Sequence, residues 1–155
     1  MERSKESDGL TDLQIEMIRS SWEKVTPNKK HHGQLLFHKL FEIAPEMTDL
    51  FPFGDDFTKP QFTTHALNIM NALDHAIQNL DNPDVLIPKL RELGQMHAGF
   101  ELTIKEFQHV GEALIWVLAT GLGDDFTPQL RTAWGDVYAI ITDVMLGAIK
   151  DVNGY

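Results

Sequence analysis

Apolar residues recur at intervals of three and four along most of this 155-residue chain, and no segment alternates strictly between apolar and polar positions. Such spacing gathers the apolar residues on one face of a helix, which the core of a globular protein can then cover. The pattern therefore predicts an all-α fold. The expected segments are residues 12–25, 28–43, a short turn near 45–51, 59–80, 84–97, 104–121 and 128–150.

Four of these segments open with a sequence that is typical of a helix N-terminus. In a capping box, a Ser or Thr side chain bonds the backbone ahead, and a Glu or Gln three residues later bonds back. The fourth start is Thr127 followed by Pro128, because proline suits the first helical position. The three boxes are Thr11 with Gln14, Thr58 with Gln61 and Thr103 with Glu106.

The length suits a single domain, since one core usually serves chains of up to roughly 250–300 residues. We expect this domain to span residues 10–150, with a flexible N-terminal extension at 1–9 and a flexible C-terminal tail at 151–155. The charged start of the chain does not resemble a secretory signal, and no stretch approaches the ~18 apolar residues of a membrane span. A cytoplasmic protein without membrane insertion is therefore expected.

The net charge and the absence of cysteine exclude several kinds of partner and site. The chain carries 13 Lys and Arg against 23 Asp and Glu, a net charge of −10. Nucleic-acid binding needs clustered basic residues to neutralise phosphates, so nucleic acid is not an expected partner. The chain has no cysteine, which excludes disulfides, thiolate zinc sites and iron–sulfur clusters.

Two of the seven histidines lie on apolar helix faces. His65 falls between Phe62 and Ile69 on the apolar face of segment 59–80. His97 continues the leucine positions of segment 84–97 at helical spacing. Two imidazoles are thus predicted to point into apolar surroundings from different helices.

Three interpretations of this pair stay open. Each histidine could be a core residue bonded to a backbone carbonyl, although a buried imidazole must satisfy two ring nitrogens. A zinc site is a weaker interpretation, because structural zinc takes four ligands and no cysteine or inward carboxylate accompanies the pair. A flat apolar cofactor that supplies four nitrogens and leaves two axial positions fits better, and haem is such a cofactor.

Short motifs elsewhere in the chain follow in the order of a known family. They are Ile18 to Trp22, His32 to Phe37 with Leu40 and Phe41, Pro45 with Phe51, Leu93 to His97, Val110 to Leu114, and Phe126 to Pro128 with Trp134 and Tyr138. On these motifs the chain resembles the globin family over residues 10–150, and is most similar to neuroglobin-like globins with six-coordinate haem. The resemblance implies a globin fold, with seven to eight helices packed three over three around a haem pocket.

The resemblance also implies roles for individual residues. His97 becomes the proximal iron ligand and His65 the distal one, with haem b as the cofactor. In globins of this type the distal histidine binds iron when no gas is present, so an incoming O₂, NO or CO must displace it. The implied cofactor-binding residues are Phe37, Phe51, Phe62, His65, Asn68, Ile69, Leu93, His97, Leu102, Phe107, Val110 and Tyr138.

Reversible gas binding is the function expected from this resemblance, in a monomer or weak dimer. The same bis-histidine haem would also serve a redox enzyme (an NO dioxygenase or nitrite reductase) or an electron carrier, with a reductase or another redox protein as partner.

Three departures from neuroglobins stand near the expected pocket. Asn68 replaces a frequent cation, Phe53 replaces a frequent tyrosine, and Gln95-Met96 replaces basic residues. Haem propionates are anionic, so the changes remove groups that could pair with them. Lys59, Lys105 and Arg91 are the expected substitutes.

Overall fold

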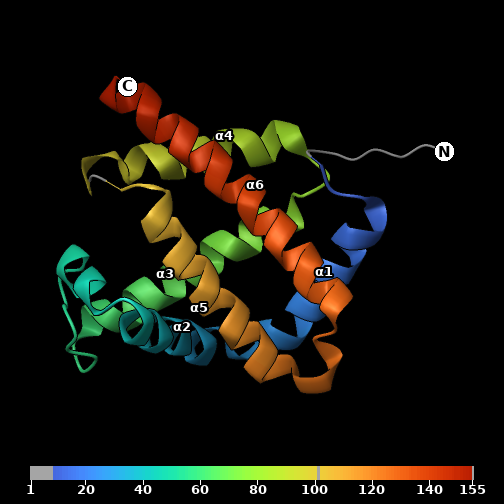
Figure 1. The fold of residues 1–155 in the computed structure, drawn as a ribbon, viewed down its shortest axis with the longest axis horizontal. Helices are drawn as coiled ribbons and strands as arrows, with labels where there is room; N and C mark the ends of the chain where they lie inside the picture. Colours follow the sequence, from blue (N-terminus) through green and yellow to red (C-terminus); the bar gives the residue numbers. More distant parts are fainter. Residues whose placement is uncertain (1–8, 101, 155) are drawn as a thin grey trace.

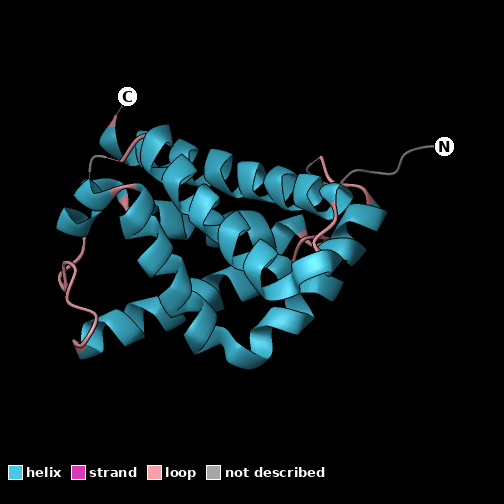
Figure 2. Ribbon diagram, turned by 60° about the horizontal axis from the view of Figure 1, so that its bottom comes forward, coloured by secondary structure: helices cyan, strands magenta, loops and turns pink. Residues whose placement is uncertain are grey.

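A computed structural model describes residues 9–100 and 102–154, in which helices are joined by short loops and turns (Figures 1 and 2). The predicted all-α class is confirmed. Seven to eight helices were expected; within these residues the structure has six α-helices and four short 3₁₀ helices. The α-helices are α1 (Asp12–Val25), α2 (Lys29–Ile43), α3 (Pro60–Gln78), α4 (Pro83–Met96), α5 (Ile104–Leu122) and α6 (Pro128–Asn153). The 3₁₀ helices are η1 (Thr26–Asn28), η2 (Pro45–Leu50), η3 (Ala98–Phe100) and η4 (Gly123–Asp125).

The helices cross one another in two groups. Helix α6 runs diagonally across the view of Figure 1 and packs against α4, α1 and α5. Helix α2 packs against α3 and α5, and these three gather in the lower left of the same view. Because α5 contacts both α2 and α6, it joins the two groups into one core.

Three of the four predicted helix starts form as expected. Thr11 and Thr103 each make a complete capping box with the side chain three residues ahead. The Thr127 hydroxyl accepts a hydrogen bond from the Leu130 amide, and Pro128 occupies the first turn. The boundaries of these helices are therefore set by local sequence.

The box predicted at Thr58 is wrong. Pro60 takes the first helical position, so Lys59 becomes the N-cap residue and Thr58 lies one residue outside the helix. The Thr58 amide and hydroxyl instead donate to the Asp56 carboxylate, at 3.1 and 2.6 Å. These hydrogen bonds also hold the pKa of Asp56 below its usual range.

Two buried tryptophans tie α1 to α3 and α6. The rings of Trp22 and Trp134 lie 5.8 Å apart, and each is about 1% exposed. The Trp22 indole N–H donates to Asp74 on α3, and that of Trp134 donates to the Ser21 hydroxyl on α1. The indole N–H groups of both tryptophans therefore have hydrogen-bond partners, as buried polar groups require.

Helix α6 extends three residues beyond its predicted end, to Asn153. Gly154 ends it in the left-handed region at φ +83°, where its amide bonds the Lys150 carbonyl. The tail predicted to start at residue 151 is thus helical as far as Asn153, whereas residue 155 and most of the predicted 1–9 extension lie outside the described residues. By length and composition alone α6 could also cross a membrane, a test that core helices pass as well. Its nine buried residues are those of a core helix.

Helices α2 and α3 approach each other closely at Gly33. A β-carbon at this position would lie 2.6 Å from the Ala66 carbonyl oxygen and 3.0 Å from Cγ of Met70. Only glycine lets the two backbones meet at this distance. One turn further along α2, Phe37 is 1% exposed and faces α3.

Gly33→Ala should therefore destabilise the fold. We expect a loss of about 1–3 kcal/mol of unfolding free energy from overpacking, despite the better helix propensity of alanine. Urea unfolding measures this loss. Gly135→Ala is the matched control, because nothing lies within 4 Å of its β-carbon position on α6. If both variants gained stability equally, the close crossing would not constrain the fold.

Candidate functional site

His97 stands immediately after the last residue of α4, where its side chain turns back toward the helix. Its Nδ1 lies 2.6 Å from the carbonyl oxygen of Leu93, one turn earlier. A carbonyl can only accept, so Nδ1 carries the proton and Nε2 keeps a free lone pair. The backbone amide of His97 also bonds the Gly94 carbonyl, at 2.9 Å. The ring is thus oriented with a metal-binding nitrogen directed away from its own helix.

His65 on α3 lies among aromatic rings. The centroid of its imidazole is 5.8 Å from Phe37, 5.2 Å from Phe51 and 6.0 Å from Phe53, each at a steep interplanar angle. The side chain is solvent-exposed overall, yet these rings desolvate the imidazole. Burial lowers the pKa of His65, and the positive charge that His97 carries when protonated lowers it further. The two imidazoles therefore lie near enough to interact, and His65 favours its neutral, metal-binding form.

Most of the other predicted pocket residues belong to the hydrophobic core or pack against it. Phe37, Phe62 and Phe107 are buried, and Asn68 is exposed at the surface of α3. The partly buried members are Phe51, Ile69, Leu93, Leu102, Val110 and Tyr138. Ring contacts bring Phe37, Phe51 and Phe62 together with one another or with His65, whereas the roles of the remaining residues toward a cofactor stay predictions.

Tyr138 uses its hydroxyl to join α6 to α5. The hydroxyl donates to the Phe107 carbonyl at 2.6 Å, and burial raises the pKa of this phenol above its usual range. Its ring lies so close to Gly111 that a β-carbon there would come within 2.8 Å of Cε2. The polar end of Tyr138 is therefore committed to helix packing.

Phe53 contacts the candidate site, although the sequence analysis noted only that it lacks a tyrosine hydroxyl. The residue is 2% exposed and reaches both Phe51 and His65. The sequence Phe51-Pro52-Phe53 could have indicated this contact, because Phe51 was already predicted to line the pocket.

The three candidate cations differ in their availability. Arg91 is bound to Asp151 on α6, so it is committed to joining α4 to α6. Lys59 and Lys105 are exposed and form no ion pair within the described residues. These two lysines remain available to an anionic group.

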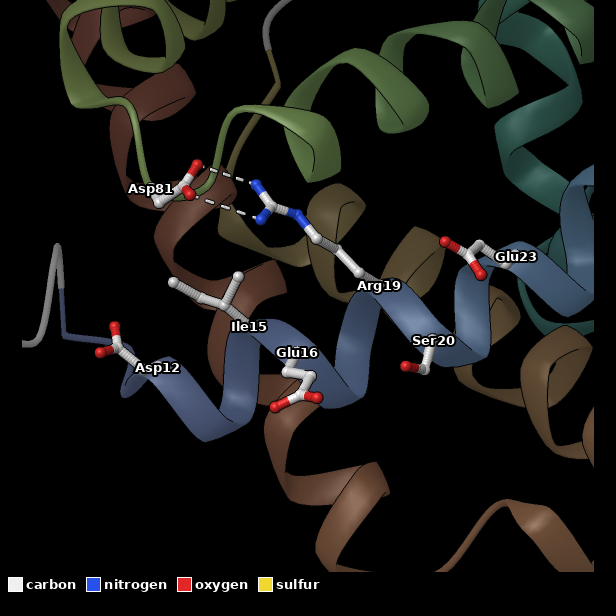
Figure 3. Close-up of a pocket in the computed structure, with 7 residues that line it drawn as sticks. All are labelled: Asp12, Ile15, Glu16, Arg19, Ser20, Glu23 and Asp81. Atoms are coloured by element: carbon white, nitrogen blue, oxygen red, sulfur yellow. Dashed lines mark hydrogen bonds and ion pairs between the residues drawn. The ribbon is translucent and has the colours of Figure 1, made fainter.

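A groove along α1 is a less suitable site. It encloses about 530 Å³ and is lined by α1 and Asp81, without a histidine (Figure 3). Arg19, the cation in its lining, donates to both oxygens of Asp81 and to the carbonyls of Ile77 and Gln78. This pairing holds the pKa of Asp81 below its usual range, and the four hydrogen bonds use four of the five N–H donors of the guanidinium.

Across residues 9–100 and 102–154, no group of three or more His, Asp or Glu side chains is arranged to hold a metal ion. A metal bound by His65 and His97 would need further ligands that these residues do not supply. This absence weakens the zinc interpretation and favours a cofactor that brings its own ligands.

Comparisons with known proteins bear on the family to which this fold belongs. A family model described as Globin matches residues 34–145. The chain is 34% identical over 143 residues to Neuroglobin-1 of Oncorhynchus mykiss, covering 88% of this chain and 90% of that protein. It is 35% identical to Neuroglobin of Dissostichus mawsoni with the same coverage. A solved structure, a hexacoordinated heme protein from an anhydrobiotic tardigrade at pH 4, matches with a TM-score of 0.86 and 25% identity, over 95% of this chain and 99% of the other.

The electrostatic coupling of the two histidines can be measured in the cofactor-free protein. We expect the pKa of His65 to lie below the ordinary value of about 6.5. Because the folded state then binds fewer protons than the unfolded state, stability falls as the pH drops below that ordinary value. In His97→Asn the pKa of His65 should rise, since one cause of the lowering is removed. NMR titration of the His65 ring protons gives both values, and an unchanged pKa in His97→Asn would contradict the coupling.

Proposed function

Because the chain belongs to the globin family, we propose that it binds haem b between His97 and His65 and uses it to bind O₂, NO and CO reversibly. The proposal depends on which ring nitrogen of His97 holds the proton. Its proton is held on Nδ1 by the Leu93 carbonyl, which leaves Nε2 as the proximal ligand atom. A hydrogen bond of this kind orients a ligating imidazole and raises its basicity.

The residues present fit such a cofactor. The described residues hold no third metal-binding side chain beside the two histidines, and a porphyrin supplies the four nitrogens that a bare ion would lack. Phe51, Ile69 and Leu93 pack against the core while staying partly exposed, so they can cover an apolar ring face. Lys59 and Lys105 are proposed to pair with the propionates.

His65 is proposed to occupy the distal axial position when no gas is present. Its ring is engaged by aromatic contacts alone, with no hydrogen bond to another described residue, so the ring nitrogens are free to bind. Its lowered pKa keeps the imidazole neutral, as a metal ligand must be. When bound, haem would supply the iron atom that binds the diatomic gas.

Competition at this position sets the apparent gas affinity. While His65 fills this position, the protein cannot bind gas. The apparent gas affinity is therefore the intrinsic affinity multiplied by the fraction of time that the position is open. Phe37 adds no second polar group on this side, because its ring carries neither a donor nor an acceptor. His65 is therefore the distal side chain that decides between the closed and open states.

Optical spectroscopy of the ferrous protein without gas tests this proposal. Wild type should show the low-spin spectrum of six-coordinate haem. His65→Leu should give a five-coordinate spectrum, because leucine cannot ligate iron. His97→Ala should lose most of its haem affinity, because the proximal ligand is removed.

The control is His31→Ala, since His31 is an exposed residue of α2 that is outside the proposed site. This variant should keep the wild-type spectrum and haem affinity. A five-coordinate spectrum of the wild-type protein would contradict the proposal that His65 is the distal ligand. Normal haem affinity and a normal spectrum in His97→Ala would contradict the proximal one.

A further inference from the structure

Phe53 is buried although it lies in the turn that follows η2. Pro52 and Asp55 in the same turn are exposed, whereas Phe53 is 2% exposed. Its ring stacks on Phe51 at 5.4 Å and 21°, and stands edge-on to Phe37 and Phe62 at 5.8 and 5.4 Å. Phe53 thus fills the interior of an aromatic cluster that spans α2, the turn and α3.

The same ring reaches the distal imidazole. The centroids of Phe53 and His65 are 6.0 Å apart at 62°, within the range of favourable edge-to-face aromatic pairs. Phe37 and Phe51 contact the imidazole as well, at 5.8 and 5.2 Å. Three rings therefore restrict the directions in which the His65 side chain can move.

The backbone of the turn holds Phe53 in place. The amide of Gly54 bonds the Phe51 carbonyl at 3.0 Å, and that of Asp56 bonds the Phe53 carbonyl at 2.9 Å. Gly54 has a φ of +57°, which glycine adopts without steric cost. The position of Phe53 against His65 is consequently a property of the folded turn, and not of one free side chain.

A second phenylalanine of the same loop provides a comparison. Phe57 contacts Phe62 at 4.6 Å, His38 at 4.0 Å and Phe41 at 5.9 Å. It belongs to the same aromatic cluster, yet it makes no ring contact with His65. Phe53 and Phe57 therefore share a packing role and differ in whether they touch the distal histidine.

We propose that Phe53 is a positioning residue for His65: its ring, buried in the aromatic cluster, holds the imidazole where it can bind iron and so sets how often that site opens to gas. The inference rests on the proposed function of His65 as distal ligand. Removal of the ring gives the imidazole room to leave the iron. A tyrosine at 53 has the same effect, because its hydroxyl finds no partner among apolar rings and must turn toward solvent.

The rate of CO binding to the ferrous haem protein tests the proposal. At saturating CO this rate equals the rate at which His65 leaves the iron. Phe53→Leu should raise the limiting rate roughly threefold to tenfold, the size of one aromatic pair contact. Phe53→Tyr should raise it as well. Phe57→Leu is the matched control and should change it by less than about twofold.

A second readout uses the cofactor-free protein. In wild type, NMR should show contacts between the ring protons of His65 and those of Phe53, together with ring-current shifts of the imidazole signals. In Phe53→Leu these shifts should move toward the values of an uncovered imidazole, and in Phe57→Leu they should stay. Urea unfolding of each variant shows that it is folded before either readout is compared.

The outcomes separate the two claims. A six-coordinate wild type, with equal limiting rates in Phe53→Leu and Phe57→Leu, overturns the inference alone and makes Phe53 a packing residue. Unshifted His65 signals in a folded Phe53→Leu also overturn it. A five-coordinate wild type overturns the proposed function, and the inference falls with it.

Discussion

The contact on which the site depends is the crossing of α2 over α3 at Gly33. The carbonyl oxygen of Ala66 occupies the space that a side chain at Gly33 would need, 2.6 Å from the β-carbon position. Ala66 is fully buried and directly follows His65. One turn along α2, Phe37 contacts the His65 imidazole. The distance between His65 and Phe37 is therefore set by two backbones that meet without an intervening side chain.

The backbone next to His97 is positioned in the same way. A β-carbon at Gly94 would lie 2.6 Å from the Met145 carbonyl oxygen, so α4 meets α6 backbone to backbone as α2 meets α3. Gly94 directly follows Leu93, whose carbonyl orients His97. Interiors are close-packed and transmit small displacements, so a shift at either crossing moves a histidine. The backbones that carry the two imidazoles are thus positioned by helix crossings, and the turn residues Phe51 and Phe53 pack against the His65 ring.

Local patterns in the sequence predicted much of this, and long-range contacts account for the rest. Helical spacing placed His65 and His97 on apolar faces, and capping boxes marked the starts at Thr11 and Thr103 correctly. The box at Thr58 was wrong because the constraint imposed by Pro60 outweighed the four-residue pattern. Nothing in the spacing along one segment encodes the ring contact between a turn residue and α3, so the position of Phe53 required the folded chain.

The difference from neuroglobins at Phe53 replaces a polar hydroxyl with an apolar ring contact. Phe53, where those proteins often carry a tyrosine, offers no hydroxyl at the rim and packs beside His65 instead. The cations proposed to pair with the propionates are the exposed Lys59 and Lys105, in a chain of net charge −10. Exposed charge pairs weaken as salt screens them, whereas apolar ring contacts are not screened. In the proposed haem protein, ion pairs with lysines would position the propionates, whereas aromatic contacts would position the distal histidine. Higher ionic strength therefore weakens only the ion pairs.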